Sequence, residues 1–211
     1  MANKNHQLDA QIIEAALSEF LQNGYEKASL RKIAAQAGVT VGAIYTRYAT
    51  KDSLFCALVQ PLVDRIGETF LSIKQDYQQE GTADSLAALT CAMEKETQAI
   101  LHLLFDDYDR AVLLLCRSAG SSMAQVFDHV VERKMEETAL FFEHAGIRHP
   151  GEAVLRMLTA AQFHMYFQII DGGYGLEEAR TMMQAAAIYH TGGWLALLAG
   201  ENREREDSHE V

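Results

Sequence analysis

Residues 30–48 hold the side chains best suited to a recognisable chemical task. Apolar residues recur there at helical spacing, and Ala34 is small where two helices would cross. Gly38 follows four residues later, where the chain must turn through a left-handed backbone conformation. This spacing predicts a helix-turn-helix, whose second helix enters the major groove of DNA by its N-terminal end. The same spacing also occurs in ordinary helical hairpins, so the flanking residues decide between the two interpretations.

The residues on either side favour DNA binding. Two aromatics, Tyr45 and Tyr48, precede a capping residue, which is followed by a lysine, an acid and a leucine that open the next helix at Lys51. Together with the apolar pattern upstream, residues 9–58 resemble the tetracycline-repressor (TetR) family. The resemblance implies a homodimeric, ligand-responsive transcription factor, usually a repressor, that binds a palindromic operator in double-stranded DNA. By position, its DNA contacts fall on Arg31, Val41, Gly42, Ala43, Tyr45 and Lys51, with Thr46, Arg47 and Tyr48 as neighbours.

The side chains themselves support some of these contacts. Lys51 lies in the first turn of a helix, where its charge opposes the helix dipole and a docked phosphate would reverse that cost. Residues 41–43 lack groups for bidentate hydrogen bonds to bases, so they would read thymine methyl groups and groove shape. Discrimination between DNA sequences would then depend on Thr40, Thr46 or Arg47. A solvated surface or plain core packing is the alternative for the basic and aromatic positions.

The elements that must position these residues are helices. Apolar residues recur every three or four positions along the chain, and β-branched residues rarely alternate. We predict an all-α fold of about nine helices and no strand. The predicted helices span 9–23, 30–37, 41–48, 51–79, 82–105, 106–116, 123–145, 151–170 and 176–199. The expected N-caps are Asp9, Ser29, Thr40, Thr50 and Thr82. A kink or restart is expected at Pro61.

The predicted domains follow from this pattern. Residues 1–55 form an N-terminal three-helix domain that contains the helix-turn-helix. Residues 56–200 form a helical domain for ligand binding and dimerisation, and residues 201–211 are a disordered tail, since they are charged and almost without apolar side chains. A ligand in the second domain would move the helix that contains Pro61 and change the separation of the two DNA-binding heads.

Charge and composition narrow the class of protein. The chain of 211 residues has a net charge of -11, which argues against a protein that coats nucleic acid. Residues 1–51 nevertheless hold six basic and four acidic residues, so the head is slightly basic. No apolar run is long enough to span a membrane, and the polar N-terminus is unlike a signal peptide, so we expect a cytoplasmic protein. Cys56, Cys91 and Cys116 are expected to be free thiols.

The second domain is expected to hold a small-molecule effector. Aromatic, methionine and isolated polar residues gather over residues 85–167, and a largely apolar pocket with a few polar anchors is typical of small-molecule sites. Plain core packing is the alternative for each of them. Glu94 and Glu96 would suit a cationic ligand, or they lie on a solvated helix face. The candidate ligand-binding residues are His102, Phe105, Arg117, Met123, Phe127, Phe163, His164 and Tyr166.

The last two long helices are the candidates for a dimer interface. Both carry apolar side chains nearly all round, which indicates that each is covered on more than one side. Two such helices from each protomer would form a four-helix bundle with twofold symmetry, and an ordinary intrachain core is the alternative. The candidate interface residues are Val154, Leu158, Ala161, Met165, Ala186, Gly193, Trp194 and Leu197.

Motifs of enzymes are not found in the sequence. It has no HExxH, P-loop, dinucleotide-binding glycine motif or Gly-x-Ser-x-Gly turn, and no pair of Glu-x-x-His segments for a di-iron centre. The acidic run at residues 106–109 is explained by helix capping and first-turn acids rather than by a metal site. We therefore predict a protein that is not an enzyme and needs no metal or cofactor. A helical small-molecule-binding protein without DNA binding is the alternative function.

Overall fold

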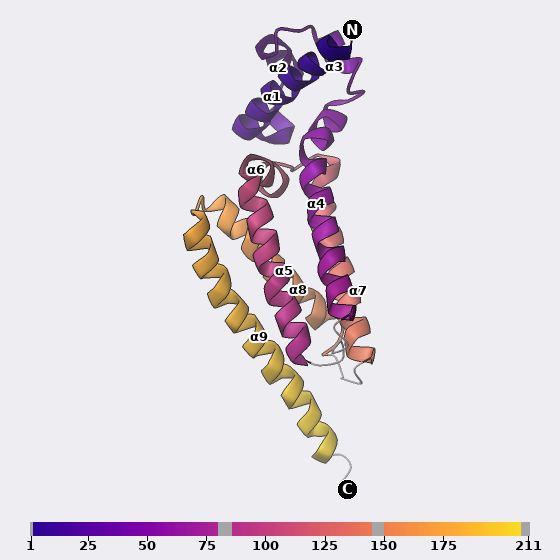
Figure 1. Ribbon diagram of the computed structural model, residues 1–211, viewed down its shortest axis with the longest axis vertical. Helices are drawn as coiled ribbons and strands as arrows, with labels where there is room; N and C mark the ends of the chain where they lie inside the picture. The colour runs from indigo at the N-terminus through magenta and orange to yellow at the C-terminus, as the bar shows by residue number, and fades with distance from the viewer. Residues whose placement is uncertain (1, 80–85, 145–149, 208–211) are drawn as a thin grey trace. The chain divides into compact units, whose positions relative to one another are not determined.

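The computed structural model describes residues 2–79, 86–144 and 150–207, and within these ranges it contains helices and no strand (Figure 1). The predicted all-α class is therefore confirmed. The α-helices are α1 (Ala2–Lys27), α2 (Leu30–Gln36), α3 (Val41–Tyr45), α4 (Lys51–Gln79), α5 (Leu86–Asp106), α6 (Tyr108–Cys116), α7 (Val126–His144), α8 (Glu152–Asp171) and α9 (Leu176–Asp207). A short 3₁₀ helix, η1 (Ser122–Gln125), precedes α7.

Two of the predicted N-caps are confirmed by their hydrogen bonds. The Thr40 hydroxyl accepts from the Ala43 N–H at 3.1 Å and so starts α3. The Thr50 hydroxyl accepts from the Ser53 N–H at 2.9 Å, and the Ser53 hydroxyl accepts from the Thr50 N–H at 3.0 Å, a reciprocal cap that starts α4. Ser29 occupies the N-cap position of α2 without a side-chain cap bond. Thr82 and residues 145–149 lie outside the described residues.

The first and last helices are longer than the sequence predicts. α1 begins at Ala2, so the predicted start at Asp9 is wrong, and the Asp9 carboxylate forms an ion pair with Arg47 instead of capping a helix. Helix continues upstream because residues 2–8 include no glycine or proline. α9 likewise continues to Asp207, beyond the predicted end at 199 and into the segment predicted to be disordered. Its alternating acids and arginines at helical spacing favour that extension.

Two positions were expected to interrupt helices, and only one does so. Gly24 has a φ of +68°, so α1 breaks there before its last turn, which agrees with the predicted helix end at residue 23. α4 runs through Pro61 as one helix, so the restart, one of the two outcomes expected there, is absent, and the kink stays a prediction. A proline in a helix interior removes a single N–H donor, and the apolar side chains of Leu58, Val59 and Leu62 are fully buried around it. Core packing therefore holds this stretch of α4 in helical form.

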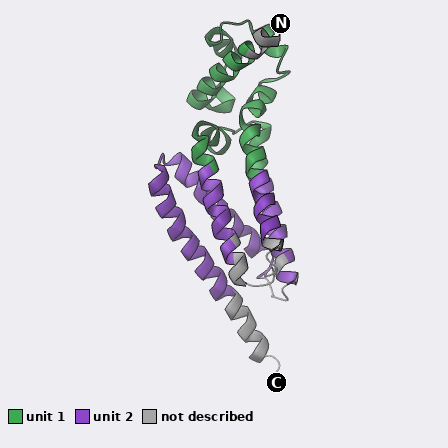
Figure 2. Cartoon of the chain, in the orientation of Figure 1, with its two compact units in different colours: residues 1–66, 103–126 green, residues 67–102, 127–211 purple. Residues whose placement is uncertain are grey.

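The chain divides into two compact units (Figure 2). Unit 1 comprises residues 1–66 and 103–126, and unit 2 comprises residues 67–102 and 127–211. The division groups α6 and η1 with the N-terminal helices, whereas the domain boundary at residue 55 stays a prediction. In unit 1 the core includes the rings of Phe20 and Phe55, which meet edge to face with centroids 5.1 Å apart.

Unit 2 has its own core. The buried side chains of Phe142 and Leu155 form a cluster on which Trp194 packs. Other fully or nearly fully buried residues of unit 2 are Ile100, Phe163, Tyr166, Ile169 and Met183. Within the described residues, none of the helices combines the length and the apolar character that crossing a membrane requires.

Candidate nucleic-acid interface and effector site

The turn between α2 and α3 has the geometry that the sequence predicts for a helix-turn-helix. Gly38 has a φ of +67° and donates its N–H to the Ala35 carbonyl at 3.3 Å. The next N–H, from Val39, returns to the Ala34 carbonyl at 2.9 Å, which closes the end of α2. Ile33, Ala34 and Ile44 are buried between the helices. The rest of α3 is thereby held at the surface of unit 1.

The solvent side of α3 carries several of the predicted DNA contacts. Tyr45 is 51% exposed, and the Thr46 hydroxyl donates back to the Gly42 carbonyl at 2.9 Å. Among the predicted contacts, Arg31, Thr40, Gly42, Tyr45 and Thr46 are exposed, and Val41, Ala43, Arg47, Tyr48 and Lys51 are half-buried. α3 therefore presents small and hydroxyl-bearing side chains, with Tyr45 as its one large exposed apolar group among the described residues of that helix.

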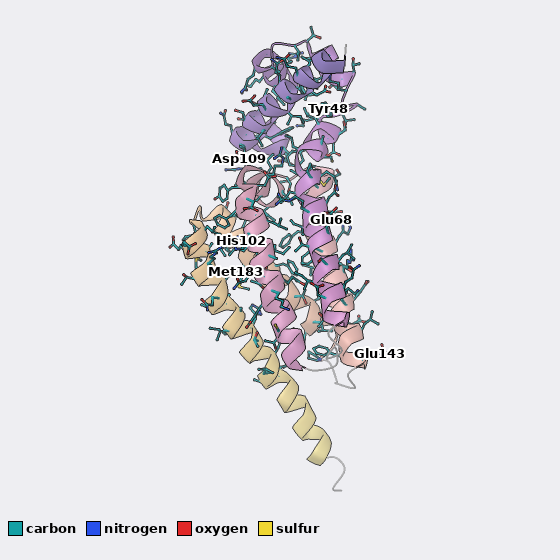
Figure 3. All side chains as sticks on the ribbon, viewed as in Figure 1. Tyr48, Glu68, His102, Asp109, Glu143 and Met183 are labelled. Carbon is teal, nitrogen blue, oxygen red and sulfur yellow. The ribbon has the colours of Figure 1, made fainter. Side chains whose placement is uncertain are left out.

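Arg47 connects the end of α3 to α1. Its guanidinium forms an ion pair with Asp9 and also donates to the Ala43 carbonyl at 3.3 Å. Tyr48 lies half-buried beside this pair and is labelled in Figure 3. Burial and the charge of Asp9 raise the pKa of Tyr48, and Arg47 partly opposes them. The basic side chain at position 47 thus has a structural partner as well as a predicted role at DNA.

The Lys51 side chain links the start of α4 to the end of α1 by hydrogen bonds. Its ammonium donates to the carbonyls of Tyr25, Glu26 and Ala28 at 2.8, 3.1 and 3.5 Å. It also lies 4.5 Å from the centroid of the Tyr25 ring. A cation at the C-terminal end of a helix is favoured by the helix dipole and by the carbonyls that lack helical partners. A phosphate contact by Lys51 stays a prediction.

A polar cluster around Asp52, which the sequence did not reveal, joins α4 to η1 within unit 1. One Asp52 oxygen accepts from the Ser122 N–H at 2.9 Å, and the other accepts from the Ser122 hydroxyl at 2.8 Å. The Tyr25 hydroxyl and the Cys56 thiol also donate to this carboxylate. The backbone bond from Ser122 is the largest influence that holds the pKa of Asp52 below its usual value. The acid of the α4 opening motif was visible in the sequence, but its partner 70 positions later was not.

A family model described as bacterial regulatory proteins of the tetR family matches residues 12–58, which include α2, α3 and the start of α4. Residues 12–58 of the chain therefore match the TetR family. The predicted resemblance is therefore confirmed, and the matched residues are those whose caps, turn and exposed helix are described above.

Two curated relatives cover more of the chain than the family model does. The transcriptional regulator AcrR of Shigella flexneri is 28% identical over 154 residues, which are 64% of this chain and 70% of AcrR. The fatty acid metabolism regulator protein of Bacillus subtilis is 27% identical over 124 residues, 58% of this chain, and the match spans 59% of that regulator. A solved TetR-like transcriptional regulator from Rhodococcus sp. RHA1 has a TM-score of 0.60 at 18% identity, over 88% of this chain and 96% of that one. That likeness shows a shared fold.

The predicted effector-site residues are divided between the two units. Phe105, Arg117 and Met123 belong to unit 1, and His102, Phe127, Phe163, His164 and Tyr166 belong to unit 2. In unit 2, the guanidinium of Arg180 donates to Nε2 of His102 at 2.7 Å (His102 is labelled in Figure 3). His164 is exposed and hydrogen-bonded to Gln168 at 3.0 Å. Each histidine thus has a protein partner, and its role at a ligand stays a prediction.

Three of the predicted aromatic residues form one cluster in unit 2. The Phe163 ring lies 5.7 Å from that of Phe127 and 6.0 Å from that of Tyr166, between centroids. Phe70 of α4, which was not predicted, joins the same cluster at 6.3 Å from Phe163. Burial raises the pKa of Tyr166, although a side-chain hydrogen bond with Thr97 partly opposes this. The periodicity of α4 marked Phe70 only as one apolar residue among many.

Beside these rings lies a group of charged side chains, Glu96, Lys134 and Glu137, which with Phe70 we call the Lys134 box. The Lys134 ammonium is hydrogen-bonded to Glu96, lies 3.6 Å from Glu137, and sits 4.4 Å from the centroid of the Phe70 ring. Burial raises the pKa of Glu96, and the charge of Lys134 opposes that rise. Burial also acts on Glu137, but Lys134, Lys74 and Arg133 outweigh it and lower the pKa of that carboxyl.

The predicted dimer residues are partly turned toward the protomer's own core. Trp194 packs on Phe142 at 5.9 Å between ring centroids. Ala161 and Gly193 are exposed, and Val154, Leu158, Met165, Ala186, Trp194 and Leu197 are half-buried. The largest exposed apolar side chains of α8 and α9 were not predicted: they are Met157, Ile188 and Tyr189, at 61%, 69% and 79% exposure. Because both helices are apolar nearly all round, the sequence did not show which stripe faces outward.

The acidic residues just before α6 form ion pairs with arginines of unit 1. Asp107 stands at the N-cap of α6 without a side-chain cap bond, and it accepts from Arg110 at 2.9 and 3.1 Å. Asp106 forms an ion pair with Arg65 at 3.6 Å. Across the residues that are described, no group of three or more histidines, cysteines or acids has the arrangement of a metal site.

Proposed function

We propose that this TetR-family chain is a homodimeric repressor that binds a palindromic operator through α3 and leaves it when a small molecule binds the helices of unit 2. The observation that carries the proposal is the exposed face of α3, which has no side chain at Gly42. Gly42 is exposed on the N-terminal half of that helix, the part that enters the major groove in a helix-turn-helix.

Among the described residues, no contact requires glycine at this position. The φ of Gly42 is not in the left-handed region, and a Cβ added there would meet only the Thr40 hydroxyl at 3.8 Å, an ordinary contact. Glycine in a helix costs about 0.5 to 1 kcal/mol relative to alanine. A residue that weakens its own helix without an internal reason suits a surface that another molecule must approach closely. For α3, that molecule would be the DNA backbone or a base edge.

The first experiment selects bound sequences from random double-stranded DNA pools. Enrichment of a palindrome is expected from a dimer that reads two related half-sites. A folded dimer that enriches no sequence at low salt, where phosphate contacts are strongest, would favour the alternative of a helical small-molecule-binding protein without DNA binding.

The second experiment compares two glycine substitutions on the selected operator. Gly42→Ala should raise the thermal midpoint of the protein while weakening operator binding at least about tenfold, the cost of one lost close contact. Gly67→Ala in α4 is the matched control, because a Cβ there meets nothing within 4 Å among the described residues and Gly67 belongs to unit 2, outside the helix-turn-helix. It should raise stability and leave operator binding unchanged. Equal operator affinity for both variants would remove the face of Gly42 from the interface.

The dimer interface is proposed to be the face of α8 and α9 that carries Met157, Ile188 and Tyr189. Three large apolar side chains exposed by 61% or more on adjoining elements of one unit are costly in water. A second copy of the same face would cover them around a twofold axis. Ile188→Glu should give a monomer by light scattering after gel filtration. Leu140→Glu on α7, at a residue with 52% exposure, is the matched control and should leave a dimer.

A further inference from the structure

The Lys134 box places charge where a helical bundle does not need it. The side chains of Lys134 and Glu96 keep only 19% and 17% of their surface exposed. Taking two charges out of water costs more than their attraction returns in many proteins, and apolar residues of similar volume often do as well or better. Stability alone therefore does not account for the Lys134–Glu96 pair. The aromatic cluster beside it in unit 2 suggests a role in ligand binding.

We propose that Phe70, Glu96 and Glu137 form a binding site for the cationic head of an organic amine or quaternary ammonium ligand. In the free protein the Lys134 ammonium fills this site as a tethered competitor. The inference rests on the proposed function in one respect only, namely that unit 2 is the part of the chain that binds an effector.

The chemistry of the box selects a cation. The face of an aromatic ring carries the negative part of its quadrupole, and Phe70 already has an ammonium 4.4 Å from its centroid. Two carboxylates flank that ammonium, and Glu96 is the more buried of them. An anion would have to displace both carboxylates from Lys134 before it met a positive charge. A ligand cation needs only to replace one ammonium by another.

The exchange leaves no buried charge without a partner. Lys134 carries its ammonium on a flexible four-carbon stem and still exposes part of its side chain, so it can turn outward into water. Glu137 keeps Lys74 at 3.1 Å and Arg133 at 3.6 Å when Lys134 leaves. Glu96 would be paired by the ligand. The rings of Phe163, Phe127 and Tyr166 continue from Phe70, and the half-buried rings of Phe127 and Phe70 offer apolar surface to the remainder of a ligand larger than lysine.

The test uses two probes that differ only in their charged group. 4-Phenylbutylamine is cationic at pH 8, and 5-phenylpentanoate carries a carboxylate on the same phenyl and four-carbon chain. Binding to the full-length protein is measured by titration calorimetry at pH 8, with circular dichroism as the check that each variant is folded.

Two variants act in opposite directions on the amine. Lys134→Met removes the competitor and should tighten binding of the amine about tenfold, in line with one cation–aromatic and one ionic contact. Glu96→Gln removes the buried carboxylate at nearly the same shape and should weaken it at least about tenfold. Glu132→Gln, at the exposed pair with Arg156 on the same helix as Lys134, is the matched control and should leave both affinities unchanged.

Two results would overturn the inference. Tighter binding of the carboxylate probe, lost in Lys134→Met, would make the box an anion site in which Lys134 is the anchor. Binding of neither probe by folded Lys134→Met below about 1 mM would make the pair a structural one only. Neither result depends on DNA, so selection from DNA pools with the same wild-type protein shows separately whether the proposed regulator function holds.

Discussion

Both units of the molecule contain a lysine over an aromatic ring, and the two pairs have nearly the same geometry. In unit 1 the Lys51 ammonium lies 4.5 Å from the Tyr25 centroid, and in unit 2 the Lys134 ammonium lies 4.4 Å from that of Phe70. Their hydrogen-bond partners differ. Lys51 donates to three main-chain carbonyls at the end of α1, whereas Lys134 is held by the side-chain carboxylates of Glu96 and Glu137.

That difference distinguishes Lys51, which links two helices, from Lys134, whose place another cation could take. Main-chain carbonyls neither titrate nor move independently of their helix, so the acceptors that Lys51 uses to hold α1 and α4 together do not change with pH. Carboxylates titrate, change rotamer and accept other cations. A ring–ammonium distance alone therefore does not tell a structural lysine from a functional one, and the partners of the ammonium do.

The largest expected effect is the loss of Lys134. Lys134→Met should lower the free energy of unfolding by about 2 to 3 kcal/mol at pH 8, somewhat less than for fully buried pairs, because it leaves the Glu96 charge unpaired. The loss should shrink at pH 5. An acid whose pKa is raised by burial takes up a proton as the pH falls, and its cost then disappears.

Urea unfolding followed by the fluorescence of Trp194, the only tryptophan in the chain, measures this effect within unit 2. The double variant Lys134→Met with Glu96→Gln should recover most of the lost stability. An equal loss at pH 5 and pH 8 would contradict the idea that an unpaired Glu96 causes it.

Removal of Lys51 is the second expected effect. Lys51→Met should cost about 2 kcal/mol, in the range for hydrogen bonds to a charged group, and the cost should be the same at pH 5 and pH 8. Faster hydrogen exchange of the last amides of α1 would locate the loss. Lys32→Met, at an exposed lysine of α2, is the control and should leave exchange in α1 unchanged. A strong dependence on pH would end the distinction drawn between the two lysines.

Loss of the Asp52 charge is expected to have a smaller effect, which also decreases as the pH falls. The bonds from Ser122 lower the pKa of Asp52. The ionised carboxylate therefore stabilises the fold above the ordinary pKa of an aspartate, and this stabilisation is lost as the pH falls through the lowered pKa. Asp52→Asn should therefore cost about 1 kcal/mol at pH 7, a modest figure because the group is partly exposed. The difference from wild type should shrink as the pH falls from 7 through the ordinary pKa of an aspartate and the lowered pKa of Asp52. Calorimetric unfolding across that range measures it, and a constant difference would show that the charge is not involved.

The smallest effect is expected at the exposed pair of Glu132 and Arg156. Glu132→Gln makes the same chemical change as Glu96→Gln, but both partners keep about half of their side-chain surface in water. The urea midpoint should not change measurably, because water and salt screen such a pair. A shift as large as that of Glu96→Gln would mean that burial does not distinguish the two glutamates.

Short-range features of the sequence predicted the local structure of the N-terminal region. Gly38 requires a left-handed turn, and Thr40 and Thr50 cap the helices that follow them. These features act over three or four residues, so a linear sequence displays them directly. The same kind of reasoning misplaced the start of α1, because Asp9 is a good cap by residue type and is drawn instead to Arg47, 38 positions away.

The amino-acid sequence by itself determined the helical class, the helix-turn-helix with its caps, the resemblance to the TetR family, and the aromatic character of unit 2. Only the tertiary structure decided the partners of the charged groups: Asp52 with Ser122, Lys51 with the end of α1, and Lys134 with Glu96. The reason is physical. Caps and periodicity depend on neighbours within one or two helical turns, whereas a charge is stabilised by whichever groups folding brings within about 4 Å, and sequence spacing does not encode that distance.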